Sequence, residues 1–181
     1  NSCRLCLPRS RRRRRIESSR NQVYSKAYRV MKMTQYKPLK VLLQEKLDTP
    51  KKDLIKDINA SRKIVWKVVK GLSKVTQGKR MSEKEFMSAV FFTCAIVDDT
   101  FTIAEYELMC SVLGRMTKER ANALFQSFLN RKNDMLSLLD KIVDDFDWGT
   151  KNALLDIIVD ILCVDGRLEV PEISYIQKLI N

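Results

Sequence analysis

Apolar residues recur along this chain with the three- and four-residue spacing of amphipathic helices, and the clearest runs occur in two copies. Residues 86–114 and 153–181 share one pattern: an apolar run, an aspartate directly after it, a short loop, a glutamate and a second apolar run. The second copy follows the first by 67 positions. This self-similarity predicts a duplicated helix–acidic loop–helix unit, with the two copies related by a pseudo-twofold axis.

Local signals mark where the predicted helices begin and end. Ser82–Glu85 and Thr102–Glu105 each have the sequence of a capping box, and Pro171 falls in a first helical turn, where proline is tolerated. Only 5 Gly and 4 Pro interrupt 181 residues. The other periodic segments predict helices over residues 38–47, 51–75, 117–129 and 133–145, with breaks at 48–50 and 147–150. The fold class that follows is all-α, a helical bundle built around the two repeats.

Charge divides the chain into three parts. Residues 1–80 carry 24 Lys and Arg against 5 Asp and Glu, whereas residues 81–181 carry 10 against 17, so their net charges are +19 and −7. Residues 1–30 include five consecutive arginines, which is typical of a disordered arm, of a targeting segment or of upstream or appended sequence. We therefore expect a basic tail (1–30), a basic helical region (31–80) and an acidic domain that contains the repeats (81–181).

The predicted helix over residues 51–75 has an apolar side and a basic side. The apolar side consists of Ile64, Val65, Trp66, Val68, Val69 and Leu72. The basic side consists of Lys63, Lys67, Lys70 and Lys74, and Lys79 and Arg80 follow it. This pattern is typical of a surface helix that packs on a core. It also fits a peripheral membrane or nucleic-acid adaptor that binds an anionic surface through these six side chains. The lack of aromatic platforms argues against sequence-specific nucleic-acid binding.

The residue types present exclude several kinds of chemistry. The chain has no histidine, so the commonest general base and every Ser–His or Cys–His nucleophile system are absent. Cys94, Cys110 and Cys163 lie in apolar runs, where a free cysteine behaves as a small hydrophobic residue. Cys3 and Cys6 lack the further ligands that a closed zinc site needs. We therefore expect a protein of the reducing cytoplasm that is not an enzyme.

The two predicted loops concentrate carboxylates. An aspartate ends each first helix, and a glutamate lies in the first turn of each second helix. The predicted cluster consists of Asp98, Asp99, Glu105, Asp165, Glu169 and Glu172. Such oxygen donors suit a hard divalent cation, Ca²⁺, Mg²⁺ or Mn²⁺. The same residues could serve only to cap helices and turn the chain. The spacing differs from that of an EF-hand, because each glutamate follows its aspartate by seven residues.

These loops carry a family resemblance. Residues 164–172 (VDGRLEVPE) and 97–105 (VDDTFTIAE) resemble the duplicated Asp-Gly-x-[Leu/Ile/Phe]-x-x-x-Glu motif of the tellurite-resistance TerB-like (TerB/DnaJ-associated) helical domain family, although Asp99 replaces the glycine of the first copy. The resemblance covers residues 82–181. It implies a cytoplasmic bacterial helical bundle linked to tellurite and stress responses, with metal-binding acidic clusters and membrane-side partners. The positions that match are Asp98, Glu105, Asp165 and Glu172, with Asp99 and Glu169 as helpers.

The sequence therefore predicts a TerB-like, non-enzymatic binding or scaffold module with a protein partner. A divalent cation at the acidic loops would neutralise the carboxylates and lock the two helical units together. The alternative function is the peripheral adaptor described above, which acts through the basic amphipathic helix. In that case the protein would be cytoplasmic but associated with an anionic membrane surface.

Overall fold

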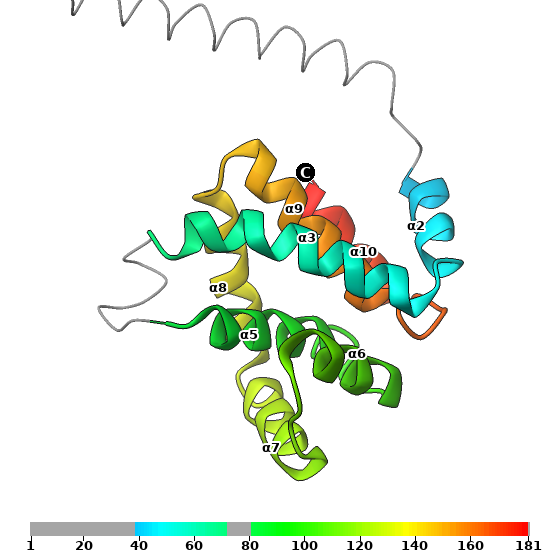
Figure 1. Cartoon of the computed structure of the whole chain (residues 1–181), viewed down its shortest axis with the longest axis vertical. Coiled ribbons are helices and arrows are strands. Elements are labelled where there is room, and N and C mark those ends of the chain that lie inside the picture. Colours follow the sequence, from blue (N-terminus) through cyan, green and yellow to red (C-terminus); the bar gives the residue numbers. More distant parts are fainter. Residues whose placement is uncertain (1–38, 72–80, 181) are drawn as a thin grey trace, which may run out of the picture. The chain divides into compact units, whose positions relative to one another are not determined.

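The structure, a computed structural model, describes residues 39–71 and 81–180, and all of their regular secondary structure is helical. This confirms the all-α fold class; the pseudo-twofold relation of the repeats stays a prediction. The chain divides into two compact units, residues 1–41 and 42–181, and the description below concerns the second. The helices, shown in Figure 1, are α2 (Leu39–Leu47), α3 (Lys51–Val69), α5 (Glu83–Ala95), α6 (Ile103–Leu113), α7 (Lys118–Leu129), α8 (Lys132–Asp144), α9 (Trp148–Leu162) and α10 (Val170–Ile180).

Helix starts follow the local sequence closely. Both predicted capping boxes form: Ser82 and Thr102 each accept the backbone N–H three residues later, and the glutamate at that position accepts the cap's own N–H. The hydroxyl of Thr117 caps α7 in the predicted place by accepting the N–H of Arg120. Side chains adjacent to each start therefore determine these three boundaries.

Three predicted boundaries were wrong by a few residues. Residues 147–150 were expected to be a break, but α9 begins at Trp148 because Asp147 caps it by accepting the N–H of Thr150 at 2.8 Å. Helix α8 begins at Lys132, just before the predicted start. Helix α3 ends at Val69, not at residue 75, and the chain turns at residues 70 and 71. Residues 72–75 of that prediction lie outside the described residues, as does the tail 1–30.

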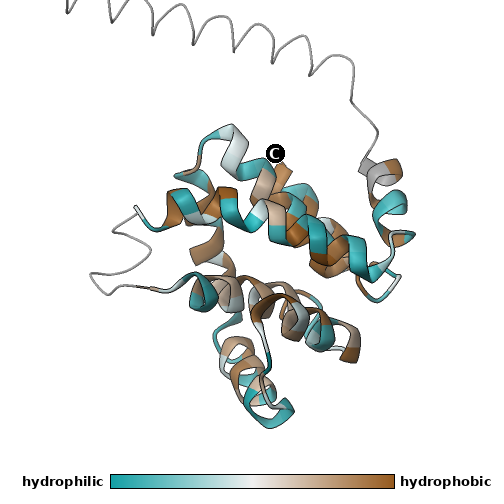
Figure 2. Cartoon of the chain, viewed as in Figure 1, coloured by the Kyte–Doolittle hydropathy of each residue, from teal (hydrophilic) through white to brown (hydrophobic). Residues whose placement is uncertain are grey.

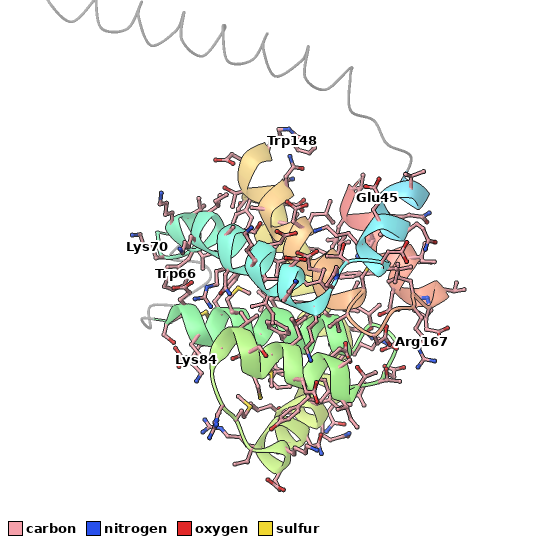
Figure 3. The ribbon with its side chains drawn as sticks, turned by 45° about the vertical axis from the view of Figure 1, so that its right-hand side comes forward. Glu45, Trp66, Lys70, Lys84, Trp148 and Arg167 are labelled. Carbon is pink, nitrogen blue, oxygen red and sulfur yellow. The ribbon has the colours of Figure 1, made fainter. Side chains whose placement is uncertain are left out.

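Helix α9 lies at the centre of the second unit. Helices α3, α5, α6 and α10 all pack on it, and its most extensive contact is with α3 (Figure 1). A helix that contacts neighbours on several sides must be apolar nearly all round, and nine of its fifteen residues are buried. Figure 2 shows this hydrophobic character concentrated on α5, α6 and α9. Trp148, 46% exposed, projects outward at the first turn of α9 (Figure 3).

The apolar run over residues 86–97 is buried, as predicted. Helix α5 packs against α6, α7, α8 and α9, and its Phe91 and Phe92 are almost completely enclosed. The ring of Phe92 lies 5.5 Å from those of Phe101 and Phe128. Phe101 belongs to the first acidic loop, so aromatic packing anchors that loop on the core. No helix among the described residues is long and apolar enough to cross a membrane.

The apolar side of α3 was predicted correctly in part. Val65 and Val69 are fully buried, together with Leu54 and Ile58 from earlier turns. Ile64 is 50% exposed, because it lies beside the buried stripe and none of the described helices covers it fully. The buried stripe of α3 is therefore narrower than the apolar pattern suggested.

Candidate functional site

The two acidic loops have the same local backbone design. Asp98 Oδ1 accepts the N–H of Thr100 at 3.1 Å, and Asp165 Oδ1 accepts the N–H of Arg167 at 3.2 Å. In each loop the residue after the aspartate has a positive φ, 65° at Asp99 and 81° at Gly166. Asp is one of the few residues besides glycine that adopts this conformation. Asp99 therefore serves the same turn as the glycine of the second loop.

Glu105 and Glu172 are the buried carboxylates of the loops. They are only 7% and 6% exposed. Oε2 of Glu105 accepts the N–H of Thr102 at 2.7 Å, and Oε2 of Glu172 accepts the N–H of Glu169 at 2.6 Å. Within the described residues, Oε1 of neither side chain accepts a hydrogen bond. The predicted capping role is therefore real, but it occupies one oxygen of each carboxylate.

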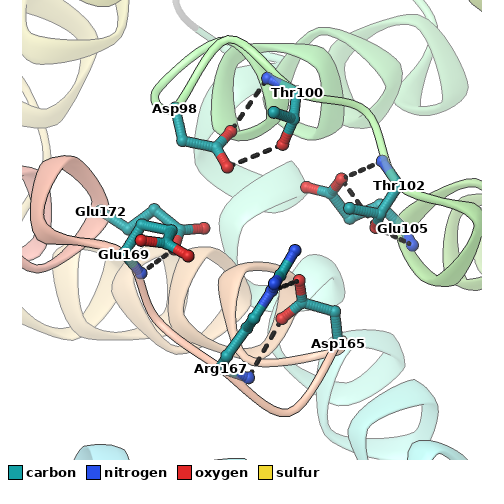
Figure 4. Close-up of polar contacts among 8 residues, drawn as sticks. All are labelled: Asp98, Thr100, Thr102, Glu105, Asp165, Arg167, Glu169 and Glu172. Carbon is teal, nitrogen blue, oxygen red and sulfur yellow. Dashed lines mark hydrogen bonds and ion pairs between the residues drawn. The ribbon is translucent and has the colours of Figure 1, made fainter.

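The fold turns the two loops toward each other, and Figure 4 shows Asp98, Glu105, Asp165 and Glu172 around a common space. Burial raises the pKa of Glu105 to about 7 against the opposing hydrogen bonds from Thr102, and the charges of Asp98 and Asp165 add to the rise. Burial raises the pKa of Glu172 to about 7 as well, with Asp98, Asp165 and Glu105 contributing. Acids 67 positions apart in sequence therefore share one electrostatic environment.

The two predicted helper residues lie differently. The carboxylate of Asp99 forms an ion pair with Lys132 at 2.7 Å, and the same ammonium donates to the carbonyl oxygen of Val97 at 2.9 Å. An internal cation from α8 therefore holds the first loop in place. Glu169 contributes its backbone N–H to Glu172, and its side chain is exposed.

The donor set matches a hard cation in type, but the ligands are not assembled. All four central groups are carboxylates, which Ca²⁺, Mg²⁺ and Mn²⁺ prefer. In the part of the chain that the structure describes, no three Cys, Asp or Glu side chains are placed closely enough to hold a metal ion. Both oxygens of Asp98 are already bonded to Thr100. A cation would therefore have to draw the two loops together.

The predicted basic surface is only partly described. Lys63 and Lys67 lie exposed on α3, and Lys70 lies exposed at its C-cap, as expected for the solvent side of this helix. Lys74, Lys79 and Arg80 lie outside the described residues. The three described lysines lie on α3 or at its C-cap, whereas the acidic loops precede α6 and α10, so the two candidate sites belong to different elements.

Sequence reasoning missed a buried ion pair between α2 and α9. Asp160 is completely buried, and its Oδ1 lies 2.6 Å from Lys46 Nζ, which also contacts Asp57 at 3.1 Å. Burial raises the pKa of Asp160 to about 6, although hydrogen bonding and attraction from Lys46 oppose the rise. The signal was present in the sequence, since Asp160 interrupts an otherwise apolar run. Its partner was not, because Lys46 comes from a distant helix.

The cysteines of the described residues behave as expected from their apolar surroundings. Cys94 and Cys163 are free and buried, and Cys110 is partly buried. Burial raises the pKa of Cys163 to about 12 and keeps the pKa of Cys94 well above its usual value. Neither buried thiol is therefore suited to act as a nucleophile.

No protein-family model, curated protein or solved structure matches this chain.

Proposed function

We propose that the chain is a TerB-like, non-enzymatic binding or scaffold module whose two acidic loops close around a divalent cation. The observation that carries the proposal is the arrangement of four carboxylates from two equivalent loops around one space (Figure 4). The motif resemblance of residues 82–181 supports the same reading and implies a bacterial cytoplasmic setting in tellurite or stress responses. A protein partner belongs to this proposal, since a scaffold acts by binding.

The electrostatics supply the reason for a cation. A rise of the pKa from 4.5 to about 7 means that ionising Glu105 or Glu172 costs about 3 kcal/mol more in the folded protein than in water. Burial causes most of this cost, and the facing aspartates add to it. A bound cation would offset both the burial and the repulsion between the acids. Its attraction for the four carboxylates takes the place of the hydration that burial removed, and its positive charge balances their negative charges.

Each carboxylate would have a definite part in the site. Glu105 and Glu172 would supply their Oε1 atoms, because Oε2 already caps the helix. Asp98 and Asp165 would keep the loop N–H bonds of their Oδ1 atoms. Their Oδ2 atoms would bind the cation in exchange for the Thr100 hydroxyl at 2.7 Å and the Arg167 side chain at 3.4 Å. Binding would connect α6 and α10 through their first turns, so the cation would stiffen the contact between the two repeats.

Thermal unfolding of the full chain tests the cation site. The protein is melted in EDTA and then with Ca²⁺, Mg²⁺, Mn²⁺ or Zn²⁺, against sodium chloride of equal ionic strength. With ~10 mM cation and a dissociation constant of ~1 mM, linkage gives about 1.4 kcal/mol, a Tm rise of roughly 3–6 °C. We expect this rise for Ca²⁺, Mg²⁺ or Mn²⁺.

Two variants locate the effect. Asp165→Asn keeps an oxygen that can accept the N–H of Arg167 but removes a central charge, so it should fold and lose most of the Tm rise. Glu119→Gln removes an exposed acid on α7 and should keep the rise. The site assignment is wrong if no divalent cation exceeds the sodium control, or if Asp165→Asn responds as strongly as the parent protein.

A further inference from the structure

A row of five lysines follows the solvent side of α3. Because an α-helix turns by about 100° per residue, the five side chains fall within roughly 60° of one another around the axis. They lie opposite Leu54, Ile58, Val65 and Val69, which face the core. All five are exposed, and together they define the lysine row: Lys52, Lys56, Lys63, Lys67 and Lys70. Lys52 and Lys56 were not part of the basic side predicted from the sequence. They extend it toward the N-terminus of α3 by about three helical turns.

The charge of the lysine row is not neutralised within the described residues. None of its five lysines forms an ion pair there. Two nearby acids are engaged by other cations: Asp57 contacts Lys46 at 3.1 Å, and Glu83 faces Arg62 at 3.4 Å. The row is therefore a line of unpaired positive charge about 27 Å long, taking ~1.5 Å per residue, with Asp53 as the acid beside its first lysine.

Apolar side chains border the row toward the C-terminal end of α3. Ile64, 50% exposed, lies between Lys63 and Lys67 in the sequence. Trp66 is partly exposed and lies with Lys70 at this end of the helix (Figure 3). An aliphatic group among lysines gains by entering the boundary between lipid headgroups and acyl chains, whereas next to phosphates in water it gains nothing.

We propose that the lysine row docks the protein on an anionic phospholipid surface, with Ile64 entering the headgroup region. The row follows one continuous helix and its C-cap, and all five lysines are exposed, so a flat surface can approach the row along its length. Lysine stems also lie along apolar surface while their ammonium groups reach phosphates. The proposal is independent of the acidic loops.

Nucleic acid is the weaker candidate for the same charge. The ring of Trp66 packs on Phe86, with centroids 6.5 Å apart, so it is not free to stack on a base. Arg62, the arginine of α3, is held by the carbonyl oxygen of Val112 at 2.8 Å and by Glu83. The lysine row contains no Asn or Gln to read adenine and no Arg, so only lysine contacts to guanine and to phosphates would remain for nucleic acid.

The magnitude follows from the number of lysines. One lysine near a phosphatidylserine-rich surface strengthens binding about fivefold, so neutralising three should weaken binding about a hundredfold at low salt. Raising the salt concentration should also weaken vesicle binding of the protein with all five lysines, since screening at ~0.5 M shortens the range of the attraction to a few ångströms.

Vesicle co-sedimentation of the full chain tests the proposal. All proteins carry Arg11–Arg15 replaced by Gln, so that the arginine run does not contribute to binding. The vesicles are phosphatidylcholine alone or with about 30% phosphatidylserine. The row variant is Lys56→Gln, Lys63→Gln and Lys67→Gln; the matched control removes three exposed charges elsewhere, Lys84→Gln, Arg120→Gln and Lys141→Gln.

We expect the parent and the control to bind phosphatidylserine vesicles at low salt, and the row variant to bind about a hundredfold more weakly. Ile64→Ser should weaken binding further at high salt, where the apolar contribution remains. Circular dichroism confirms that each variant folds, since every altered side chain is exposed. Vesicle binding of the row variant within twofold of the control overturns the proposal. Binding of the same proteins to a DNA oligonucleotide is measured in parallel. If the row variant loses DNA binding but keeps its vesicle binding, the proposal is overturned in favour of nucleic acid.

Discussion

Replacement of Lys46 by methionine probes the buried ion pair on α9. Lys46→Met removes the ammonium that lies 2.6 Å from Asp160 but keeps an apolar stem of similar shape. Asp160 is then a buried carboxylate without its cation, because its side chain is fully enclosed. Removing one partner of a buried pair typically costs 3–5 kcal/mol. The Lys46 side chain is 18% exposed, so water can partly replace it, and we expect about 3 kcal/mol at pH 8.

The stability lost in Lys46→Met should increase with pH. Burial raises the pKa of Asp160 from 3.8 to about 6, so the folded state keeps its proton when the unfolded state has lost it. Stability linked to Asp160 is therefore full below about pH 3.8 and declines until the pH passes about 6, by about 3 kcal/mol in the parent protein. Without Lys46 the folded pKa is higher still. The effect of Lys46→Met should then be small near pH 4 and reach its full size near pH 8.

Urea unfolding followed by circular dichroism, at pH values from about 4 to about 8, measures this difference. Comparing variant with parent at each pH cancels other titrating groups, such as Glu105 and Glu172. Lys51→Met is the matched control, because its pair with Glu107 is exposed and should contribute at most about 1 kcal/mol. Adding Asp160→Leu to Lys46→Met should restore stability by removing the buried charge. Equal destabilisation at both ends of the pH range, or a loss no larger than the control's, would refute the reasoning.

Three further predictions concern the loops, the core and the cysteines. Gly166→Ala should lower the free energy of unfolding by about 1–2 kcal/mol in denaturant titrations, because φ is 81° although no atom crowds the position. Leu154→Ala should lower it by about 2–5 kcal/mol in the same assay, since this fully buried side chain of α9 would leave a cavity. In native protein, a thiol reagent followed by peptide mapping should label Cys110 well before Cys94 or Cys163, and unfolding should abolish the difference.

Helix positions and local loop design followed largely from the sequence. The capping boxes at Ser82 and Thr102, and the cap at Thr117, formed as predicted, because each depends on residues three positions apart. The predicted break at residues 147–150 was wrong, because an aspartate can cap a helix as readily as it forms a turn, and Asp147 caps α9. The apolar pattern of α9 begins only after its first residues, so it did not indicate the helix start. Short-range hydrogen bonds at helix starts can thus be predicted from the sequence, but the exact boundary of a helix cannot be predicted to within one or two residues.

The duplicated acidic loop was visible in the sequence, and its two copies share a turn at Asp99 and Gly166. The sequence allowed the two loops to face each other but did not require it. The packing of α5, α6 and α10 on α9 turns the loops toward one another. The repeated aliphatic positions Ile103 and Val170 are 69% and 74% exposed, although their pattern resembles that of core residues. Periodicity defines a face of a helix, and only the neighbouring helices decide how much of that face is covered.

The sequence by itself determined the all-α class, most helix starts, the repeat and the separation of basic and acidic halves, since all of these depend on residue type and short spacing. Tertiary structure decided which charges lost water. Asp160 became buried beside Lys46, Glu105 and Glu172 came to face the opposite loop, and the lysines of α3 stayed in solvent. Desolvation depends on atoms brought from distant parts of the chain, so no local pattern encodes it.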